Sequence, residues 1–276
     1  MSETLTMVVE LRVDSVMSNK ARTDSEVLFE EYLTSHGHQE WTHEEPIEGK
    51  LKNPDYRIEH SGSLLFFEVK EFESAMPSMG YGAYDPYRPI REKINQAALQ
   101  FKEYKEFPCS VVLASPKPTF VHLAYPSVII GAMLGNLGVQ FPVGGTTDQM
   151  EQVFLGGGKM INDQRQEPQN TSISAVVVLT RYPLREKQVR ITINERESEL
   201  GRRLTIEEQM ELYEAVDPAE HRRVRVVVYE NPYARMPLTR ELFRGPFDER
   251  YGVDGEFIRR IYVGDEIERI NDALGE

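Results

Sequence analysis

The chain has 276 residues, of which 40% are hydrophobic and 28% are charged, and these ordinary values for a globular protein exclude the disordered and membrane classes. Its net charge of −13 opposes attraction to nucleic acid, unless a bound divalent metal, a small basic groove or a partner protein supplies that attraction. The only cysteine, Cys109, excludes a disulfide framework and a multi-Cys zinc site, and it predicts the cytoplasm. Neither a secretory signal nor a membrane-spanning run is recognisable, so no membrane role is predicted.

The first elements predicted are a helix and a β-hairpin. Residues 24–36 favour a helix, with Asp24 or Ser25 as its N-cap and Gly37 just after its last turn. A polar connection then leads to Pro54. The segments DYRIEH and LLFFEVKEF follow, and because they flank the small-residue turn SGS, they predict two antiparallel strands.

The next stretch predicts a second helix and a buried strand. Residues 74–90 are dense in Gly, Pro and Tyr and predict a long irregular loop. A helix is expected from about 89 to 107, and CSVVLAS at 109–115 is typical of a buried strand. The order helix, hairpin, helix, strand indicates an α/β fold with a mixed sheet.

Beyond residue 120 the patterns are less regular. Two more strands are expected at 172–179 and 223–230, with a charged helix, TIEEQMELYEAV, between them. The segment GGTTDQMEQVFLGGGKM fails as a phosphate-binding loop because Val153 replaces its first glycine and Met160 follows its lysine. The length of 276 residues lies between that of one large domain and two small ones, and we expect one core followed by an extension.

Three residues of the hairpin predict chemistry. Glu68 and Lys70 interrupt an apolar strand, and the pleat places them on one face, roughly 7 Å apart. Asp55, at the start of the first strand, can meet them across the pair. Two converging carboxylates repel each other unless a cation lies between them, and such oxygen ligands suit Mg²⁺ or Mn²⁺. Lys70 beside that metal can orient a water and stabilise charge on a phosphate.

The set Pro54, Asp55, a spacer of 12 residues, then Glu68-x-Lys70 after an apolar run resembles the active-site signature of the PD-(D/E)xK, or restriction-endonuclease-like, nuclease superfamily. The resemblance covers about residues 20–120.

Two further motifs extend this resemblance. Members usually carry a glutamate on the helix before the hairpin, which corresponds to Glu26. Gln100 and Tyr104 match the Q-x-x-x-Y motif of the subset that resembles RecB-type nucleases. Lys93 and Gln96 continue the same helix face, which is expected to point toward the substrate backbone.

The resemblance implies a restriction-endonuclease-like core over residues 20–120, with a central mixed β-sheet flanked by helices, and a C-terminal α/β extension over 121–276 packed on it. It further implies a Mg²⁺-dependent deoxyribonuclease, with Mn²⁺ as a substitute, that acts in DNA restriction, phage defence, or recombination and repair. The implied metal ligands are Glu26, Asp55 and Glu68. The implied catalytic residues are Asp55, Glu68 and Lys70, and the implied substrate-positioning residues are Gln96, Gln100 and Tyr104. A homodimer and a protein partner for targeting are compatible with it.

Several alternatives stay open. The second hypothesis is a nuclease-like fold kept as a non-catalytic subunit that binds a protein partner or nucleic acid. The negative charge favours it, and the intact set of Asp55, Glu68 and Lys70 counts against it. The third hypothesis is an unrelated acidic α/β protein that binds a partner. His36, His38 and His43 are interpreted as exposed or helix-capping residues. The connection before Pro54 and the 74–90 loop are expected to form walls of the substrate groove.

Overall fold

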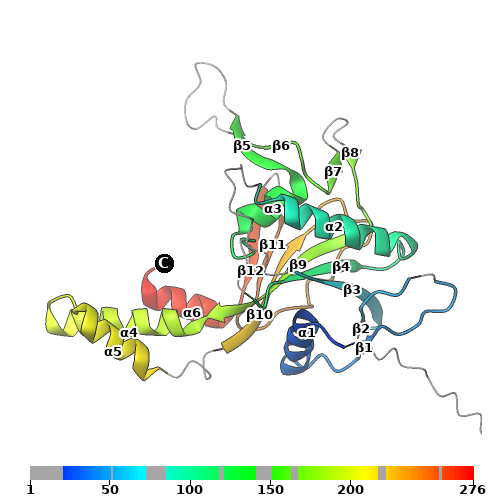
Figure 1. Cartoon of the computed structure of the whole chain (residues 1–276). Coiled ribbons are helices and arrows are strands. Elements are labelled where there is room, and N and C mark those ends of the chain that lie inside the picture. The colour runs from blue at the N-terminus through cyan, green and yellow to red at the C-terminus, as the bar shows by residue number, and fades with distance from the viewer. Residues whose placement is uncertain are drawn as a thin grey trace, which may run out of the picture.

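The computed structural model describes residues 21–50, 52–72, 85–117, 121–140, 151–162, 167–216, 222–254 and 257–276. Within these ranges the chain is an α/β protein with six α-helices and a central mixed sheet of eight strands, in the order β1-β2-β3-β4-β9-β10-β11-β12 (Figure 1). The helices are α1 Asp24–Ser35, α2 Arg88–Gln100, α3 Pro126–Leu134, α4 Leu184–Leu200, α5 Ile206–Ala215 and α6 Asp265–Leu274, and a 3-10 turn, η1, spans Phe101–Glu103. The central strands are β1 Trp41–His43, β2 Tyr56–His60, β3 Ser63–Glu71, β4 Cys109–Ala114, β9 Ile173–Pro183, β10 Arg222–Glu230, β11 Glu249–Asp254 and β12 Phe257–Val263.

The predicted hairpin is present as β2 and β3. These strands pair antiparallel, and Ser61 (φ 52°) and Gly62 (φ 76°) form the turn between them. Two residues with positive φ are what a type I′ hairpin turn requires, and they match the twist of the strands. The sequence did not predict β1, which pairs antiparallel with β2 at the edge of the sheet.

The centre of the sheet is parallel and apolar. Helix α2 connects β3 to β4, which run parallel, and β4 also runs parallel to β9. All six residues of β4 are buried, as expected for a strand covered on both faces. The strands predicted at 109–115, 172–179 and 223–230 are thereby confirmed as β4, β9 and β10.

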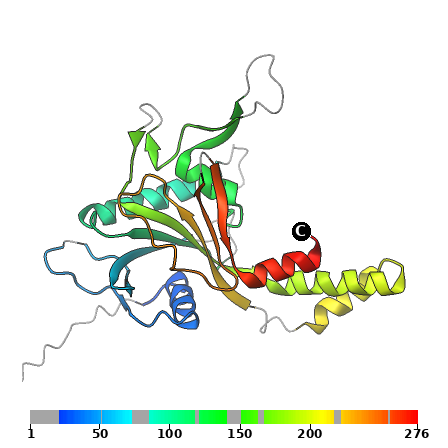
Figure 2. The same cartoon turned by 180° about the vertical axis from the view of Figure 1, so that it is seen from behind.

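Helices cover both faces of this sheet. Because side chains alternate along a strand, Phe66 and Val111 face a core formed with α2 and α3, whereas Phe67 and Val112 face a core formed with α1. Figures 1 and 2 show α1 on one side of the sheet and α2 with α3 on the other.

Helix α1 begins at Asp24, where the predicted helical stretch also begins. Its N-cap is Thr23, not Asp24 or Ser25: the Thr23 hydroxyl accepts from the Glu26 N–H at 3.2 Å, and the Glu26 carboxylate accepts from the Thr23 N–H at 2.6 Å. The Ser25 N–H, another donor with no partner inside the helix, donates to the Glu71 carboxylate of β3 at 2.9 Å. These bonds fix the N-terminus of α1 beside β3.

The second predicted helix is shorter than expected. It ends at Gln100 rather than near 107, because Phe101 and Tyr104 turn inward and are almost completely buried. Phe107 precedes Pro108, which disfavours helical backbone at that residue. The chain therefore passes through η1 into β4.

Residues 121–276 contribute four strands, β9 to β12, to the same sheet that contains β1 to β4. The predicted charged helix is α5, and α4, which the sequence did not predict, projects with it as an arm to one side of the sheet (Figure 1). Two small hairpins lie above α2 and α3 in Figure 1, formed by β5 (Asn136–Gln140) with β6 (Glu151–Leu155) and by β7 (Ile161–Asn162) with β8 (Glu167–Pro168). Most of the loop predicted at 74–90 falls outside the described residues. In the part of the chain that is described, no helix has both the length and the apolar character needed to cross a bilayer.

A buried polar contact joins α1 to the C-terminal strands. The Tyr32 hydroxyl donates to the Asp248 carboxylate at 2.5 Å. Asp248 is fully buried and also accepts from the Val226 and Gly245 N–H groups, at 2.9 and 2.6 Å. Burial first, and the charge of Asp248 second, raise the pKa of Tyr32, so this hydroxyl stays protonated as the donor. The Tyr32–Asp248 bond thus links α1 to a residue 216 positions later in the chain.

We expect Tyr32→Phe to lower the free energy of unfolding by about 1–3 kcal/mol, because it leaves a buried carboxylate short of one donor. Urea denaturation measures this loss. Tyr182→Phe is the matched control, since Tyr182 is also buried but its hydroxyl has no hydrogen-bond partner among the described residues. Equal stability of the two variants would contradict the proposed contribution of the Tyr32–Asp248 bond.

Candidate active site

Glu68 is a buried acid near the middle of the molecule. It lies on β3, on the face toward α2, and only 1% of its side chain is exposed. Its Oε1 accepts from Lys70 Nζ at 2.5 Å and from Gln100 Nε2 at 2.8 Å. Its Oε2 is buried and has no hydrogen-bond donor among the described residues. A buried carboxylate oxygen without a donor is costly, so this atom points to a ligand.

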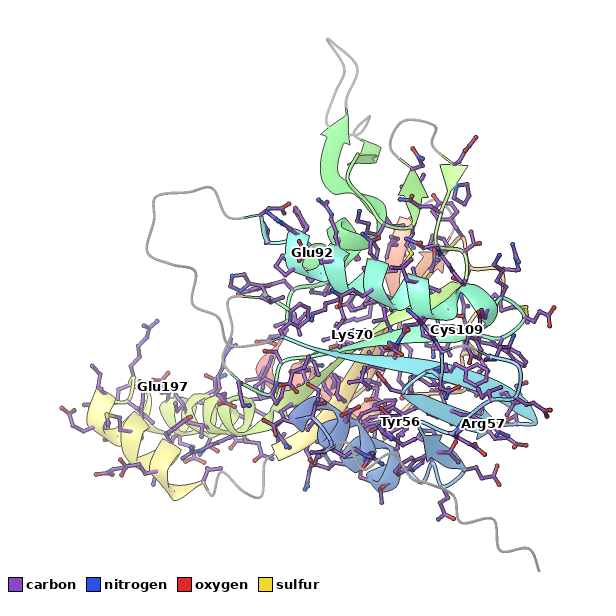
Figure 3. All side chains as sticks on the ribbon, turned by 45° about the vertical axis from the view of Figure 1, so that its right-hand side comes forward. Tyr56, Arg57, Lys70, Glu92, Cys109 and Glu197 are labelled. Carbon is purple, nitrogen blue, oxygen red and sulfur yellow. The ribbon has the colours of Figure 1, made fainter. Side chains whose placement is uncertain are left out.

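Lys70 follows Glu68 on the same face of β3, as the sequence predicted. Its side chain is 19% exposed, so the ammonium reaches solvent from a mostly buried stem. Figure 3 shows Lys70 on the side of the sheet that α2 covers. The same side chain therefore neutralises Glu68 and remains accessible to a bound molecule.

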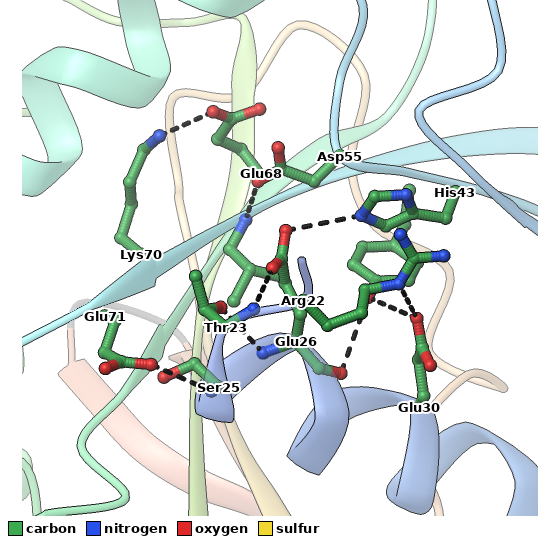
Figure 4. Close-up of polar contacts among 12 residues, drawn as sticks. Arg22, Thr23, Ser25, Glu26, Glu30, His43, Asp55, Glu68, Lys70 and Glu71 are labelled. Atoms are coloured by element: carbon green, nitrogen blue, oxygen red, sulfur yellow. Dashed lines mark hydrogen bonds and ion pairs between the residues drawn. The ribbon is translucent and has the colours of Figure 1, made fainter. Parts of the chain in front are cut away.

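Asp55 comes directly before β2 and is brought to Glu68 by the hairpin (Figure 4). Its Oδ2 accepts from the Val69 N–H at 2.7 Å, and its own carbonyl accepts from the Glu44 N–H at 2.9 Å. Burial first, and the charge of Glu68 second, raise the pKa of Asp55 to about 7, against the opposing effects of the Val69 N–H and Lys70. The two carboxylates therefore repel each other, and a cation between them would relieve that repulsion.

Glu26 approaches from α1, on the other face of β3. Its Oε1 lies 3.3 Å from His43 Nε2, and its Oε2 closes the helix cap at Thr23. Burial alone would raise the pKa of Glu26, but the bonds from Thr23 and His43 outweigh it and the pKa is lowered. Its charge still reaches Asp55, whose pKa it helps to raise. Glu26 is thus near the site, but its carboxylate is engaged elsewhere.

His43 was interpreted from the sequence as exposed or helix-capping, and that interpretation is wrong. Its side chain is 7% exposed and packs edge-on against Tyr56, with ring centroids 4.9 Å apart. The burial of His43 was missed because His43 belongs to strand β1. A strand of three residues is too short to show an alternation of apolar and polar residues in the sequence. The connection before Pro54 contacts the candidate site through His43, which lies beside Glu26, and through the Glu44 N–H, which donates to the Asp55 carbonyl. Its role as a wall of a substrate groove stays a prediction.

The residues expected to position substrate lie on α2 and just after it. Gln100 donates its amide to Glu68 and so orients that carboxylate. Tyr104 is 1% exposed, and its hydroxyl donates to the Lys52 carbonyl at 2.6 Å, which fixes the chain two residues before Pro54. Gln96 is exposed, and Lys93 Nζ lies 5.9 Å from the centre of the Phe72 ring. Of these residues only Gln96 is exposed, whereas Lys93 and Gln100 are half-buried.

The donor set fits a divalent cation only in part. Asp55 and Glu68 offer oxygen ligands, and the donor-free Oε2 of Glu68 is directly available. Within the residues that the structure describes, however, no three His, Cys, Asp or Glu side chains are grouped so that they hold a metal ion. The carboxylate of Glu26 is bonded to His43 and Thr23, and Oε1 of Glu68 is bonded to Lys70 and Gln100.

Comparison with protein-family models, with curated proteins and with solved structures finds no match to this chain.

The raised pKa of Asp55 predicts a pH-dependent stability. Between the ordinary value of 3.8 and about 7, the native carboxyl keeps a proton that the unfolded chain has lost. The free energy of unfolding of the metal-free protein should therefore fall as the pH rises through this range. In EDTA at pH 8, we expect Asp55→Asn to be more stable than the wild type, by on the order of 2 kcal/mol.

Urea denaturation across the pH range checks this. Asp272→Asn, at an exposed aspartate of α6, is the control and should leave the pH dependence unchanged. A wild type and an Asp55→Asn variant with parallel pH profiles would show that Asp55 carries no excess proton.

Proposed function

We propose that this protein is a divalent-metal-dependent deoxyribonuclease of the PD-(D/E)xK superfamily, which hydrolyses phosphodiester bonds in DNA. The observation that carries the proposal is the buried meeting of Asp55, Glu68 and Lys70 on one hairpin, with Oε2 of Glu68 lacking a donor. Desolvating two repelling acids beside a lysine is unfavourable without a function that uses them.

The fold supports the finer assignment of a restriction-endonuclease-like core. The order expected from the resemblance is present as α1, the β2–β3 hairpin, α2 and β4. Glu26 of α1, Asp55 just before β2 and Glu68 of β3 lie close together (Figure 4). Gln100 of α2 donates to the same Glu68.

The chain's own residues have distinct roles in this reaction. Asp55 and Glu68 would hold a divalent ion, which supplies Lewis acidity and lowers the pKa of bound water. Lys70, by leaving Glu68, can place its ammonium on the scissile phosphate and stabilise the charge that builds as water attacks phosphorus and the ester oxygen departs. Gln100 keeps the Glu68 carboxylate oriented. Glu26 is a third proposed ligand, which requires its carboxylate to leave His43.

The biological setting proposed from the resemblance is DNA restriction, phage defence, or recombination and repair, in the cytoplasm. A homodimer would allow both strands of a duplex to be cut, and a protein partner would target the enzyme.

We expect the wild type to nick supercoiled plasmid or degrade single-stranded DNA with Mg²⁺ or Mn²⁺ and not with EDTA. Asp55→Ala, Glu68→Ala and Lys70→Ala should each lose at least about 100-fold in rate, because each removes a group that stabilises the transition state. Arg196→Ala, on the arm formed by α4 and α5, is the control. The label of Glu197 marks that arm in Figure 3, well apart from Lys70. Cleavage retained in all three site variants would end the proposal.

Metal binding offers a test independent of turnover. Calorimetric titration with Mn²⁺ should show binding to the wild type that Glu68→Gln abolishes. Because the pKa of Asp55 is about 7, binding near neutral pH should also release a proton, seen as a heat that depends on the ionisation enthalpy of the buffer. Binding without proton release would show that Asp55 is not a ligand.

The second candidate is a non-catalytic subunit with the same fold. It is favoured by the closed ion pair of Glu68 with Lys70 and by the net charge of −13. It predicts neither cleavage nor metal binding in the assays above, and a partner molecule that binds the intact chain.

A further inference from the structure

An open groove of about 530 Å³ lies at the C-terminal end of α2. Its walls come from α2 and the turn after it, from the segment before β9, and from the loop after β10. The residues lining it are Asn95, Ala98, Leu99, Lys102, Lys105, Asn170, Thr171, Ser172 and Arg235, and none of them is acidic. In a chain with 45 acidic residues, that composition is unusual.

The three cations of this groove have no carboxylate partner among the described residues. Elsewhere the arginines are commonly paired, as Arg181 is with Glu31 and Arg240 with Glu230. Lys102 and Lys105 follow the end of α2, where a positive charge interacts favourably with the helix dipole. Arg235 comes from a different segment and has no such role. Three converging like charges repel one another, and an anion in the groove would relieve that repulsion.

The wall that carries Arg235 is fixed before any ligand binds. The Arg235 N–H donates to the Thr171 carbonyl at 2.8 Å, and the Ser174 hydroxyl donates to the Met236 carbonyl at 2.5 Å. Asn170 donates its side-chain amide to the Lys159 carbonyl at 2.6 Å. The hydroxyls of Thr171 and Ser172 remain as additional donors for an anion.

The groove and the candidate active site occupy different faces of one helix. At about 100° per residue, Asn95 and Ala98 point roughly 150° away from Gln100, which contacts Glu68. No aromatic side chain lines the groove, so bases have no surface on which to stack. Its donors suit phosphate oxygens, which carry no sequence information.

We propose that this groove binds phosphate groups of the sugar-phosphate backbone of nucleic acid, as a contact separate from the catalytic residues. The choice of nucleic acid as the ligand rests on the proposed function, whereas the anion site rests on the groove itself. It provides the small basic surface through which an acidic protein can hold DNA.

The test compares two double variants that each remove two positive charges. Lys102→Gln/Arg235→Gln alters the groove, and Arg196→Gln/Arg203→Gln alters exposed arginines of the α4–α5 arm that have no acid partner among the described residues. Binding of a short labelled DNA duplex, and of a single strand, is followed by fluorescence anisotropy in EDTA over a series of salt concentrations. Urea denaturation confirms that both variants are folded.

We expect the groove variant to bind DNA about 10-fold more weakly than the wild type. The slope of the logarithm of the binding constant against the logarithm of the salt concentration should be shallower by about one to two units. The arm variant should match the wild type. If both variants bind alike, the proposal is wrong. A different result would identify a free phosphate compound as the ligand. In that case inorganic pyrophosphate protects the wild type but not the groove variant against unfolding, and the two bind DNA with equal affinity. The assignment to nucleic acid would then be wrong.

Failure of the groove proposal can be distinguished from failure of the nuclease proposal. Salt-linked DNA binding that depends on Lys102 and Arg235, without cleavage in Mg²⁺ or Mn²⁺, would support the groove and reject the enzyme. Metal-dependent cleavage with equal binding by both variants would support the enzyme and reject the groove.

Discussion

The arrangement of this molecule depends on one unfavourable event, the burial of the Glu68 carboxylate on a central strand. Left alone, a charge there would cost several kcal/mol, and the chain offsets that cost with Lys70 two residues later and with Gln100 from α2. Gln100 can reach Glu68 only if α2 crosses the sheet at the right place. The turn after α2 is in turn held by Tyr104 on the Lys52 carbonyl, beside the segment that presents Asp55. The hairpin and the helix thus fix each other through polar contacts with the same few residues.

The acids around Glu68 are not equivalent, and the sheet explains the difference. Glu68 and Lys70 occupy the face toward α2, Glu26 comes from the opposite face, and Asp55 lies between them at the start of β2. Burial first, and repulsion from Glu68 second, therefore raise the pKa of Asp55 to about 7, whereas hydrogen bonds from Thr23 and His43 keep the pKa of Glu26 lowered. Binding of a cation would act first on Asp55 and Glu68. In the proposed enzyme, the basic groove on the other side of α2 would hold DNA at one face of the helix, while the reaction would take place at the other face.

The sequence predicted the features whose formation depends on residues close together in the chain. The turn at Ser61 and Gly62, the helical stretch of α1, the apolar run of β4 and the meeting of Asp55 with Glu68 and Lys70 all follow from residues close together in the chain. What the sequence did not predict depends on distant partners. His43 is buried because a three-residue edge strand places it against Tyr56, and Gln100 turns to Glu68 because of a parallel crossover. Helix α4 was missed because Val189, Ile191 and Ile193 alternate as in a strand, and its helical state depends on packing with α5 and α6.

The position of β9 in the sheet has a consequence for synthesis of the chain on the ribosome. Strand β4 is complete at Ala114, but its second neighbour begins only at Ile173, and the Asp248 that holds Tyr32 of α1 emerges later still. During that interval the nascent chain presents an apolar, unpaired strand edge, which is prone to association with other chains. The hairpin bearing Glu68 is made early, yet the helices and strands that enclose it close only when the C-terminal segments arrive. A chain cut short before Asp248 would therefore be a substrate for chaperones and proteases rather than a stable folded protein.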